Sequence, residues 1–559
     1  MPQDKFKKEI SNAISKAIGK KIDIDSIEIP PNPEMGDYAY PCFTLSKELK
    51  KNPNEIAKEI GEKIKSGKYI DSVKVLGPYI NFFVKKETLN ENVLSEIVKN
   101  KLNYGRGKIK KTTLLEGWQP NTHKAFHIGH IRNAVLGESI ARILEFYGHK
   151  VIRVSYMGDV GAHVAKWIWY FNKFYKGSIP KKNVSKWAGE IYTEATKKSD
   201  GDEKYKEEIN EVHKKLEEGD KKLVELWKKT RTLCLDDLYE IFDELGCKIN
   251  KGFFESEVEK PGKKIVEGLV KNKLAEIDED AIIMHLEEYN LGVFVLLKSN
   301  GASLYSTKDI ALAYLKSKKY KFDNSLYIVA SEQDFYFKQL FKCLELIKYK
   351  EFKKLNHVSY GLVKLKEGKM SSREGNIILY EEFRDDLIKK VEEVMKDRKL
   401  KNKKKVIGAV SFGAMKFTML NQDSNREIIF DSEKALSFDG ETGPYTQYTY
   451  ARICSILKKV KVGNKIKFSL LNSDEEKRII KLLNEYPLVV EKAAMTYKPN
   501  LISRNLLDLC QAFNEYYHKY KVLDEDEALR KARVLLIYCV KVVIGSGLGL
   551  LGIEAIEEM

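Results

Sequence analysis

Two short strings in the sequence combine residue types that could bind phosphate groups. The first is His127-Ile128-Gly129-His130, in which two imidazoles stand three positions apart, close to one helical turn. Imidazole N–H groups can donate hydrogen bonds to phosphate oxygens as charge develops there, and a glycine lets a nucleotide approach the backbone without a Cβ in the way. Taken alone, a match of four residues is more often a coincidence with two surface histidines. Its context decides between the two interpretations.

The second string is Lys369-Met370-Ser371-Ser372-Arg373, which lies between Gly368 and Gly375. A loop with a lysine and small hydroxyls suits a pyrophosphate group that has to be gripped and then released. By itself, a loop of this composition is usually no more than a solvated connection. The pair is more specific than either string, because the two strings would follow different strands of one sheet.

The elements around these strings alternate between strand and helix in two separate parts of the chain. The predicted strands are 112–116, 150–156, 325–330 and 357–365, and the predicted helices are about 130–147 and 335–347. This order indicates an α/β fold with a doubly wound, Rossmann-like parallel sheet, which binds ligands at the carboxyl ends of its strands. The first string also begins a helix, whose N-terminus favours phosphate.

Three domains are predicted along the chain. Residues 1–105 mix helical periods with a strand-like run and indicate a small α+β domain. Residues 106–435 contain the sheet, with a charged, mostly helical insert at about 167–245. Residues 436–559 show only helical periods, which predicts an all-α bundle.

The composition limits the class of protein. No run reaches the roughly 18 apolar residues of a membrane span, and the N-terminus lacks the apolar core of a signal peptide, so we expect a cytoplasmic protein without a membrane partner. The seven cysteines form no C-x-x-C pair, which favours buried reduced thiols and no zinc. The formal charge of +17 fits a polyanionic partner, although a lysine-rich surface explains it equally well.

The two strings resemble the HIGH and KMSKS signatures of class I aminoacyl-tRNA synthetases, and neighbouring strings narrow the resemblance to the arginyl-tRNA synthetase family. These are 120–133 (PNTHKAFHIGHIRN), 156–161 (YMGDVG), 304–311 (LYSTKDIA), 330–334 (ASEQD), 443–448 (GPYTQY) and a stretch from 528–533 (ALRKAR) to 550–554 (LLGIE). Together they cover almost the whole chain in the family's order.

The resemblance implies an arginine–tRNA ligase that converts arginine and ATP, accompanied by Mg²⁺, to arginyl-AMP and transfers the arginyl group to the terminal adenosine of tRNA-Arg. We expect it to act as a monomer. His127 and His130 would serve the ATP phosphates, and Lys369 would serve the leaving pyrophosphate. The remaining implied ATP contacts are Gly129, Met370, Ser371 and Ser372.

One position departs from the usual signature. Ser372 stands where most class I enzymes have a second lysine, which removes one pyrophosphate contact. Many arginyl enzymes lack this lysine, and a lysine just before the first signature replaces it. Lys124, three residues ahead of His127, fits that place and joins Lys369 and the two histidines as a predicted catalytic residue.

The arginine pocket is also implied by the resemblance. A guanidinium offers five donors in a planar fork, so its pocket needs acceptors. The implied ligands are Glu116, Tyr305, Asp309 and Gln333 around the guanidinium, with Asn121 near the α-amino and carboxylate end. Asp309 could instead cap a helix, and both roles could coexist.

The flanking domains would hold tRNA. In the N-terminal domain the best candidates are Tyr79, for stacking on a D-loop base, and Asn81, for hydrogen bonds to a base edge. In the C-terminal domain, Asn514, Tyr516 and Tyr517 could face the anticodon. Core packing is an equal alternative for Tyr79 and the more common fate of aromatics at helical spacing.

Two rival functions remain open from the sequence. Another class I synthetase, such as the cysteinyl type, would be expected to show zinc-ligand cysteines. A paralogue that has lost catalysis and only binds tRNA would explain the serine at position 372 of the second string. Against this, both histidines and the proposed guanidinium acceptors are present. The insert could touch the acceptor stem or merely decorate the surface.

Overall fold

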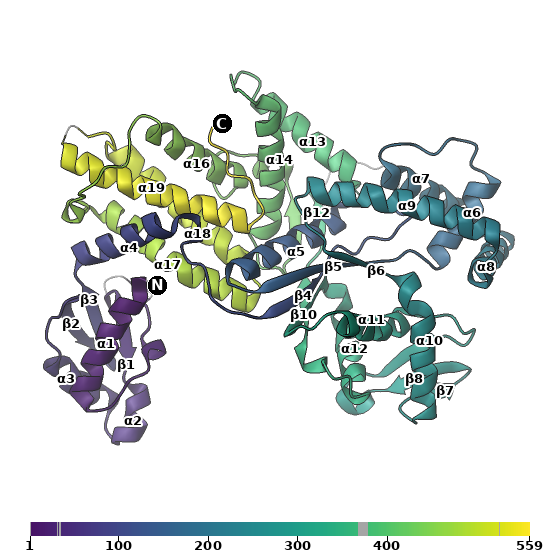
Figure 1. The fold of residues 1–559 in the computed structure, drawn as a ribbon, viewed down its shortest axis with the longest axis horizontal. Helices are drawn as coiled ribbons and strands as arrows, with labels where there is room; N and C mark the ends of the chain where they lie inside the picture. Colours follow the sequence, from purple (N-terminus) through teal and green to yellow (C-terminus); the bar gives the residue numbers. More distant parts are fainter. Residues whose placement is uncertain (1, 31, 33–34, 367–377, 525) are drawn as a thin grey trace.

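The N-terminal region forms a small antiparallel sheet covered by helices (Figure 1). The structure, a computed structural model, describes residues 2–30, 32, 35–366, 378–524 and 526–559. The strands lie in the order β1 (Tyr38–Pro41), β3 (Tyr79–Val84), β2 (Ile70–Leu76), and α1 (Pro2–Ile18), α2 (Phe43–Leu49) and α3 (Pro53–Lys63) complete the domain. Phe6, Ile10 and Ile56 are among the buried residues of its own core, so the expected α+β domain is present.

A parallel five-stranded sheet lies at the centre of the chain. Its order is β11 (Leu355–Tyr360), β10 (Asn324–Ala330), β4 (Thr112–Glu116), β5 (Lys150–Met157) and β6 (Lys251–Phe254). The helices α5 (Ile128–Phe146) and α12 (Asp334–Leu346) follow β4 and β10. This confirms the predicted doubly wound class, with β4 between β10 and β5.

One predicted strand is divided in two. The run expected at 357–365 ends as β11 at Tyr360, and β12 (Val363–Leu365) pairs instead with β13 (Ile428–Phe430). The chain leaves the sheet at Gly361, whose N–H donates to the carbonyl of Ser424. A Cβ at Gly361 would lie 2.5 Å from the backbone of Arg426, so only glycine permits this contact.

The insert is helical, as expected, and has its own aromatic core. It comprises α6 (Ala162–Lys173), α7 (Val184–Ser199), α8 (Glu203–Glu218) and α9 (Lys221–Glu244). Trp167 and Trp187 are buried in this core with rings 5.4 Å apart. Asp159, just after β5, ties α9 to the sheet because its carboxylate accepts from Arg231 Nε at 2.6 Å and from the Ser256 N–H at 2.9 Å.

A smaller unit between the insert and β10 was not predicted from the sequence. It consists of α10 (Glu255–Lys271), the antiparallel strands β7 (Glu276–Asp278), β8 (Ala281–His285) and β9 (Val293–Leu297), and α11 (Tyr305–Lys319). These strands have only three to five residues, too few to show a clear hydrophobic periodicity.

The C-terminal region is the expected helix bundle. Its helices, with those that lead into it, are α13 (Tyr380–Val394), α14 (Lys403–Leu420), α15 (Ser432–Ala435), α16 (Gly443–Leu457), α17 (Asp474–Thr496), α18 (Asn500–Lys519) and α19 (Glu527–Leu550). α4 (Lys86–Asn100), which the sequence placed with the N-terminal domain, packs on this bundle through Val93, Leu94 and Ile97 (Figure 1).

The most apolar helix of the described chain is α19. It is long and apolar enough to cross a membrane by composition, but 78% of its most apolar window is buried inside the bundle. Packing within the bundle therefore accounts for its composition. All seven cysteines are buried, as expected, and none is bonded to another.

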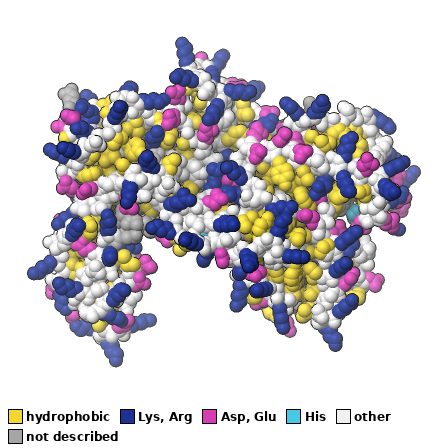
Figure 2. All heavy atoms as spheres, in the orientation of Figure 1, with side chains coloured by type: hydrophobic (Ala, Val, Ile, Leu, Met, Phe, Trp, Pro, Cys, Tyr) yellow, Lys and Arg dark blue, Asp and Glu magenta, His cyan; other side chains and the backbone are white. Residues whose placement is uncertain are grey.

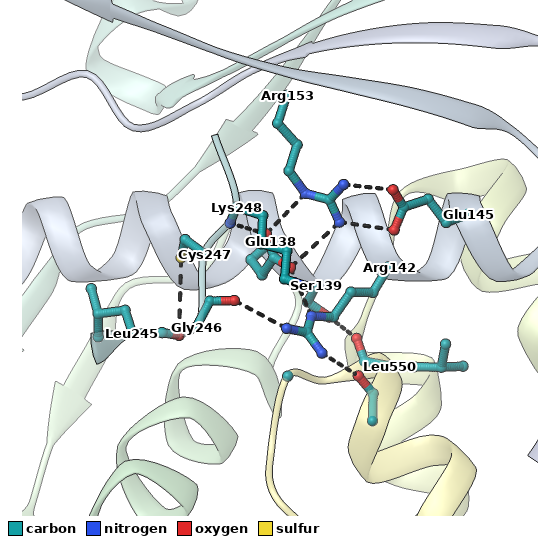
Figure 3. Close-up of polar contacts among 12 residues, drawn as sticks. Glu138, Ser139, Arg142, Glu145, Arg153, Leu245, Gly246, Cys247, Lys248 and Leu550 are labelled. Carbon is teal, nitrogen blue, oxygen red and sulfur yellow. Dashed lines mark hydrogen bonds and ion pairs between the residues drawn. The ribbon is translucent and has the colours of Figure 1, made fainter. Parts of the chain in front are cut away.

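A polar network joins α5 to both the sheet and the bundle (Figure 3). Arg153 of β5 donates to Glu138 at 3.0 Å and to Glu145 at 2.6 Å, both on α5. Arg142 of the same helix donates to the carbonyls of Gly549 at 3.3 Å and Gly246 at 3.0 Å. The helix that starts at the first string is thereby held along its far half by charged hydrogen bonds.

Lysine and arginine side chains are spread across the visible face of the molecule and alternate with acidic ones (Figure 2). They cover the N-terminal domain, the bundle and the insert alike. The positive charge on this face is therefore a distributed feature and does not form one separate patch.

Candidate active site

The first string lies at the carboxyl edge of the central sheet. The loop after β4 runs from Gly117 to His127, and α5 begins at Ile128. Because β4 is flanked by β10 on one side and β5 on the other, this loop opens at the point where a doubly wound sheet binds ligands (Figure 1).

His127 and His130 cap α5 reciprocally. His127 is the N-cap residue, and its Nδ1 accepts from the Gly129 N–H at 3.1 Å. The Nδ1 of His130 accepts from the His127 N–H at 3.2 Å, and the ring centroids lie 3.8 Å apart. A backbone N–H can only donate, so in each neutral ring the proton must be on Nε2.

Both rings are uncharged at neutral pH. Burial and the charge of Lys124 lower the pKa of His127 to about 4. Burial, the His127 ring and Lys124 lower the pKa of His130 well below its usual value. The pair therefore supplies two neutral Nε2–H donors, which can strengthen their bonds as charge grows on an acceptor.

Gly129 has a second reason to be glycine. A Cβ there would lie 3.0 Å from Cε1 and 3.2 Å from Nδ1 of His127. Any larger residue would push against the capping ring. The glycine therefore fixes the histidine pair as well as leaving the backbone open.

The insert supports the loop before His127. His123 has a left-handed backbone with φ of 60°, and its buried Nε2 lies 2.8 Å from Thr230 Oγ1 of α9. The His123 ring packs edge-on against Trp167 of α6 at 4.9 Å. A Cβ at Gly189 of α7 would lie 2.4 Å from the Cβ of Ala125. The insert is therefore part of the wall that holds the site.

Lys124 lies beside the histidine pair. Its charge contributes to the lowered pKa of both His127 and His130. Its ammonium also lies 4.8 Å from the ring centroid of Tyr192 on α7. Lys124 therefore lies next to both histidines, and its role as the replacement cation stays a prediction.

The second string, with Lys369, Met370, Ser371 and Ser372, lies outside the described residues. The chain that follows it is placed, and it contacts the first string. The Ile128 N–H donates to the carbonyl of Ile378 at 3.1 Å, and the Tyr380 N–H donates to that of Phe126 at 3.0 Å. His127 and Leu379 form an antiparallel bridge between these bonds.

Two acids from different elements share a buried region near the end of β4. Glu116 forms an ion pair with Lys316 of α11 and accepts from Gln119 Nε2 at 2.9 Å. Asp309 accepts from the Tyr336 hydroxyl at 2.6 Å. Burial raises the pKa of Asp309 to about 7, and the charge of Glu116 adds to this rise while the bond from Tyr336 opposes it.

The charges in this region are not fully balanced. Lys316 pairs with Glu116, and no ion pair within the described chain neutralises Asp309. A cation that arrived beside Asp309 would favour its ionised form. Asp309 lies inside α11, which begins at Tyr305 after the N-cap Leu304, so the alternative that it caps the helix is wrong.

The other predicted arginine ligands differ in how exposed they are and in how they are held. Tyr305, one turn before Asp309, is 62% exposed, and Gln333 is exposed in the turn after β10. Asn121 forms a parallel bridge with Gly158, whose missing Cβ leaves room for the Asn121 Oδ1. Sequence reasoning missed Tyr336 and Lys316, although Lys316 lies seven positions after Asp309, two turns along the same helix.

A second buried pair adjoins the pocket. Lys308 donates to Glu255 at 2.6 Å, with both side chains less than a tenth exposed.

Among the described residues, no group of three or more His, Cys, Asp or Glu side chains is arranged to hold a metal ion.

The predicted tRNA contacts divide between surface and core. In the N-terminal domain, Tyr79 is 37% exposed and packs edge-on against Phe43, whereas Asn81 is 4% exposed. In the bundle, Tyr517 is exposed and lies under the guanidinium of Arg452.

Tyr516 and Asn514 lie differently from the prediction. Tyr516 is fully buried, because its ring packs in the bundle core instead of facing a ligand. The amide of Asn514 is engaged internally, since it donates to the Tyr445 hydroxyl at 2.9 Å and accepts from Arg452 at 2.8 Å.

Family models match all three regions of the chain. "tRNA synthetases class I (R), catalytic domain" covers residues 92–432. "DALR anticodon binding domain" covers residues 446–559, and "Arginyl tRNA synthetase N terminal domain" covers residues 4–84.

Individual proteins resemble the chain along its full length. The arginine–tRNA ligase of Halothermothrix orenii is 36% identical over 99% of this chain and 100% of its own. That of Clostridium perfringens is 37% identical over 95% and 96%. The arginyl-tRNA synthetase of Thermus thermophilus shares the fold, with a TM-score of 0.83 at 24% identity over 99% of this chain and 100% of that one.

Proposed function

The chain belongs to the arginyl-tRNA synthetases, the class I arginine–tRNA ligases, and from that premise we propose how its own residues carry out the reaction. The enzyme joins arginine to tRNA-Arg in two steps that share the crevice beside β4 and β10. Arginine and ATP, with Mg²⁺ arriving as part of the nucleotide substrate, bind there first.

In the first step, an oxygen of the arginine carboxylate forms a bond to the α-phosphorus, and the bond to the pyrophosphate oxygen breaks. The products are arginyl-AMP and pyrophosphate. His127 and His130 donate from Nε2 to the phosphate oxygens. Because these donors are uncharged, their advantage lies in the transition state, where the acceptors gain charge. Lys124 and Lys369 balance the charge of the leaving pyrophosphate.

Arginine is selected by its guanidinium. Asp309 is the principal acceptor in this proposal, because Glu116 already has Lys316 as a partner. Tyr305, Gln333 and Glu116 complete the pocket, and Asn121 holds the α-amino and carboxylate end. The raised pKa of Asp309 supports this assignment, since a ligand cation would supply the missing charge.

In the second step, the 2′-hydroxyl of the terminal adenosine attacks the arginyl carbonyl carbon, and AMP leaves. We assign tRNA binding to residues 1–105 and 436–559, through Tyr79 in the first and Tyr517 in the second. Asn81 and Asn514 contribute by supporting the surfaces around these rings. The enzyme acts in the cytoplasm as a monomer.

Aminoacylation of a tRNA-Arg transcript, with each of the twenty amino acids in turn, tests this function. We expect the transcript to be aminoacylated with arginine alone. Charging with another amino acid would overturn the assignment of the pocket. Tight tRNA binding without any charging would instead support a paralogue that has lost catalysis.

A further inference from the structure

One aromatic side chain of the helical insert faces the phosphate end of the site. Tyr192 of α7 is partly buried, and its ring centroid lies 4.8 Å from the ammonium of Lys124. The ammonium of Lys166 on α6 lies 5.8 Å from the same centroid. No assigned step of the reaction uses Tyr192.

The backbone around this contact is fixed. Gly189, one turn before Tyr192, meets the loop so closely that a Cβ there would lie 2.7 Å from the nitrogen of Ala125. Ala125 is the neighbour of Lys124. The two chain segments that carry the ring and the lysine are therefore in direct contact, which keeps their side chains within reach of each other.

No stronger partner of Lys124 is found among the described residues. The Tyr192 ring is its aromatic contact, and within the part of the chain that the structure describes no carboxylate forms an ion pair with Lys124. Such a carboxylate would neutralise the ammonium and compete with pyrophosphate. An aromatic face attracts a cation more weakly and leaves its charge intact.

We infer that Tyr192 is a positioning residue for Lys124, so that the insert contributes a side chain to the pyrophosphate half of the site. This inference rests on the proposed role of Lys124. The ring restricts the four rotatable bonds of the lysine, and the ammonium can still turn toward phosphate because phosphate binds it more strongly than the ring does.

The test is arginine-dependent ATP–pyrophosphate exchange, measured with tRNA-Arg present, for Tyr192→Leu and Tyr192→Phe. Leucine removes the aromatic face, so the exchange rate should fall about three- to tenfold and the KM for pyrophosphate should rise, with the KM for arginine unchanged. Phenylalanine keeps the face and should stay within about twofold of the parent.

Phe174→Leu is the matched control, because Lys198 lies 4.6 Å over that ring elsewhere in the same insert. It should leave the KM for pyrophosphate unchanged. A thermal melt of each variant checks that the insert is folded.

A second arm uses Lys124→Ala. If Tyr192 acts through Lys124, adding Tyr192→Leu to Lys124→Ala should cost less than about twofold more. The inference is overturned if leucine matches the parent, if phenylalanine is as poor as leucine, or if the two losses multiply. Should Lys124→Ala itself have no effect while arginine still drives exchange, the lysine's role and this inference fail together and arginine activation stands.

Discussion

The backbone N–H of Ile128 donates to the carbonyl oxygen of Ile378 at 3.1 Å, and this bond joins the start of α5 to the chain that comes after the second string. Ile128 follows the capping histidine, and Ile378 follows the second string. The neighbouring bond from Tyr380 to Phe126 makes the junction a short piece of paired backbone. The chain leaving the second string is thereby positioned by the same residues that begin α5.

Gly129→Ala should impair activation more than stability. The added Cβ would lie 3.0 Å from the His127 ring, which must shift, and a misplacement of this kind costs roughly 10- to 100-fold in exchange rate. Gly268→Ala on α10 is the control, since nothing lies within 4 Å of its Cβ position. Equal exchange rates for both variants would refute the proposed link between Gly129 and the ring.

Asp309→Asn should weaken arginine recognition. Loss of a charged acceptor should lower kcat/KM for arginine roughly 10- to 150-fold, with little change in the KM for ATP. Steady-state exchange kinetics provide the measurement. A larger effect on ATP than on arginine would move Asp309 out of the guanidinium pocket.

The same aspartate should make stability fall as pH rises. Its pKa is raised from 3.8 to about 7 in the folded protein, so its contribution is fully present below about pH 4 and is lost as pH rises through 7. Without arginine, the thermal midpoint of Asp309→Asn minus that of the parent should therefore increase from pH 5 to pH 8. Saturating arginine should make this increase smaller. A constant difference across that range would contradict the raised pKa.

The rate at saturating substrates should show no histidine titration near neutrality. Because the pKa of His127 is lowered to about 4 and that of His130 lies well below its usual value, both rings stay neutral from pH 6 to 8. Neither histidine should therefore contribute a pH dependence to the exchange rate across this range. An inflection near pH 6.5 that disappears in His127→Asn would show that the ring acts as a cation.

The polar network around α5 should stabilise the fold. Arg153 and Glu138 are 6% and 5% exposed, and removing one partner of a buried pair costs about 3–5 kcal/mol. Glu138→Gln should lower the thermal midpoint clearly. Glu427→Gln, which breaks an exposed pair with Lys364, should change it little. Similar midpoints for the two variants would argue against this stabilising role.

Sequence patterns predicted those elements whose periodicity reflects burial on one side. The strands at 112–116 and 325–330 and the helix that begins the site were found within about two residues, because their apolar runs face the sheet core. The break at Gly361 was missed, because it depends on contact with Arg426, which is distant in sequence.

The site was predictable where local chemistry defines it and less so where packing does. The two histidines and the glycine between them can be recognised in four residues of sequence. Which ring nitrogen of each histidine carries the proton depends on the capping hydrogen bonds, which only the structure shows. Lys316 and Tyr192 reach the site through folded contacts that no motif records. Tyr516 and Tyr517 are neighbours, and only the packing of α18 decides that one is buried and the other exposed.

Arginine-dependent ATP–pyrophosphate exchange by the parent and by His127→Ala, with tRNA-Arg present, tests the central claim most directly. We expect exchange with arginine and with no other amino acid, and a fall of about 100- to 1,000-fold when the His127 donor is removed. Exchange that persists in His127→Ala, or that another amino acid supports equally well, would contradict it.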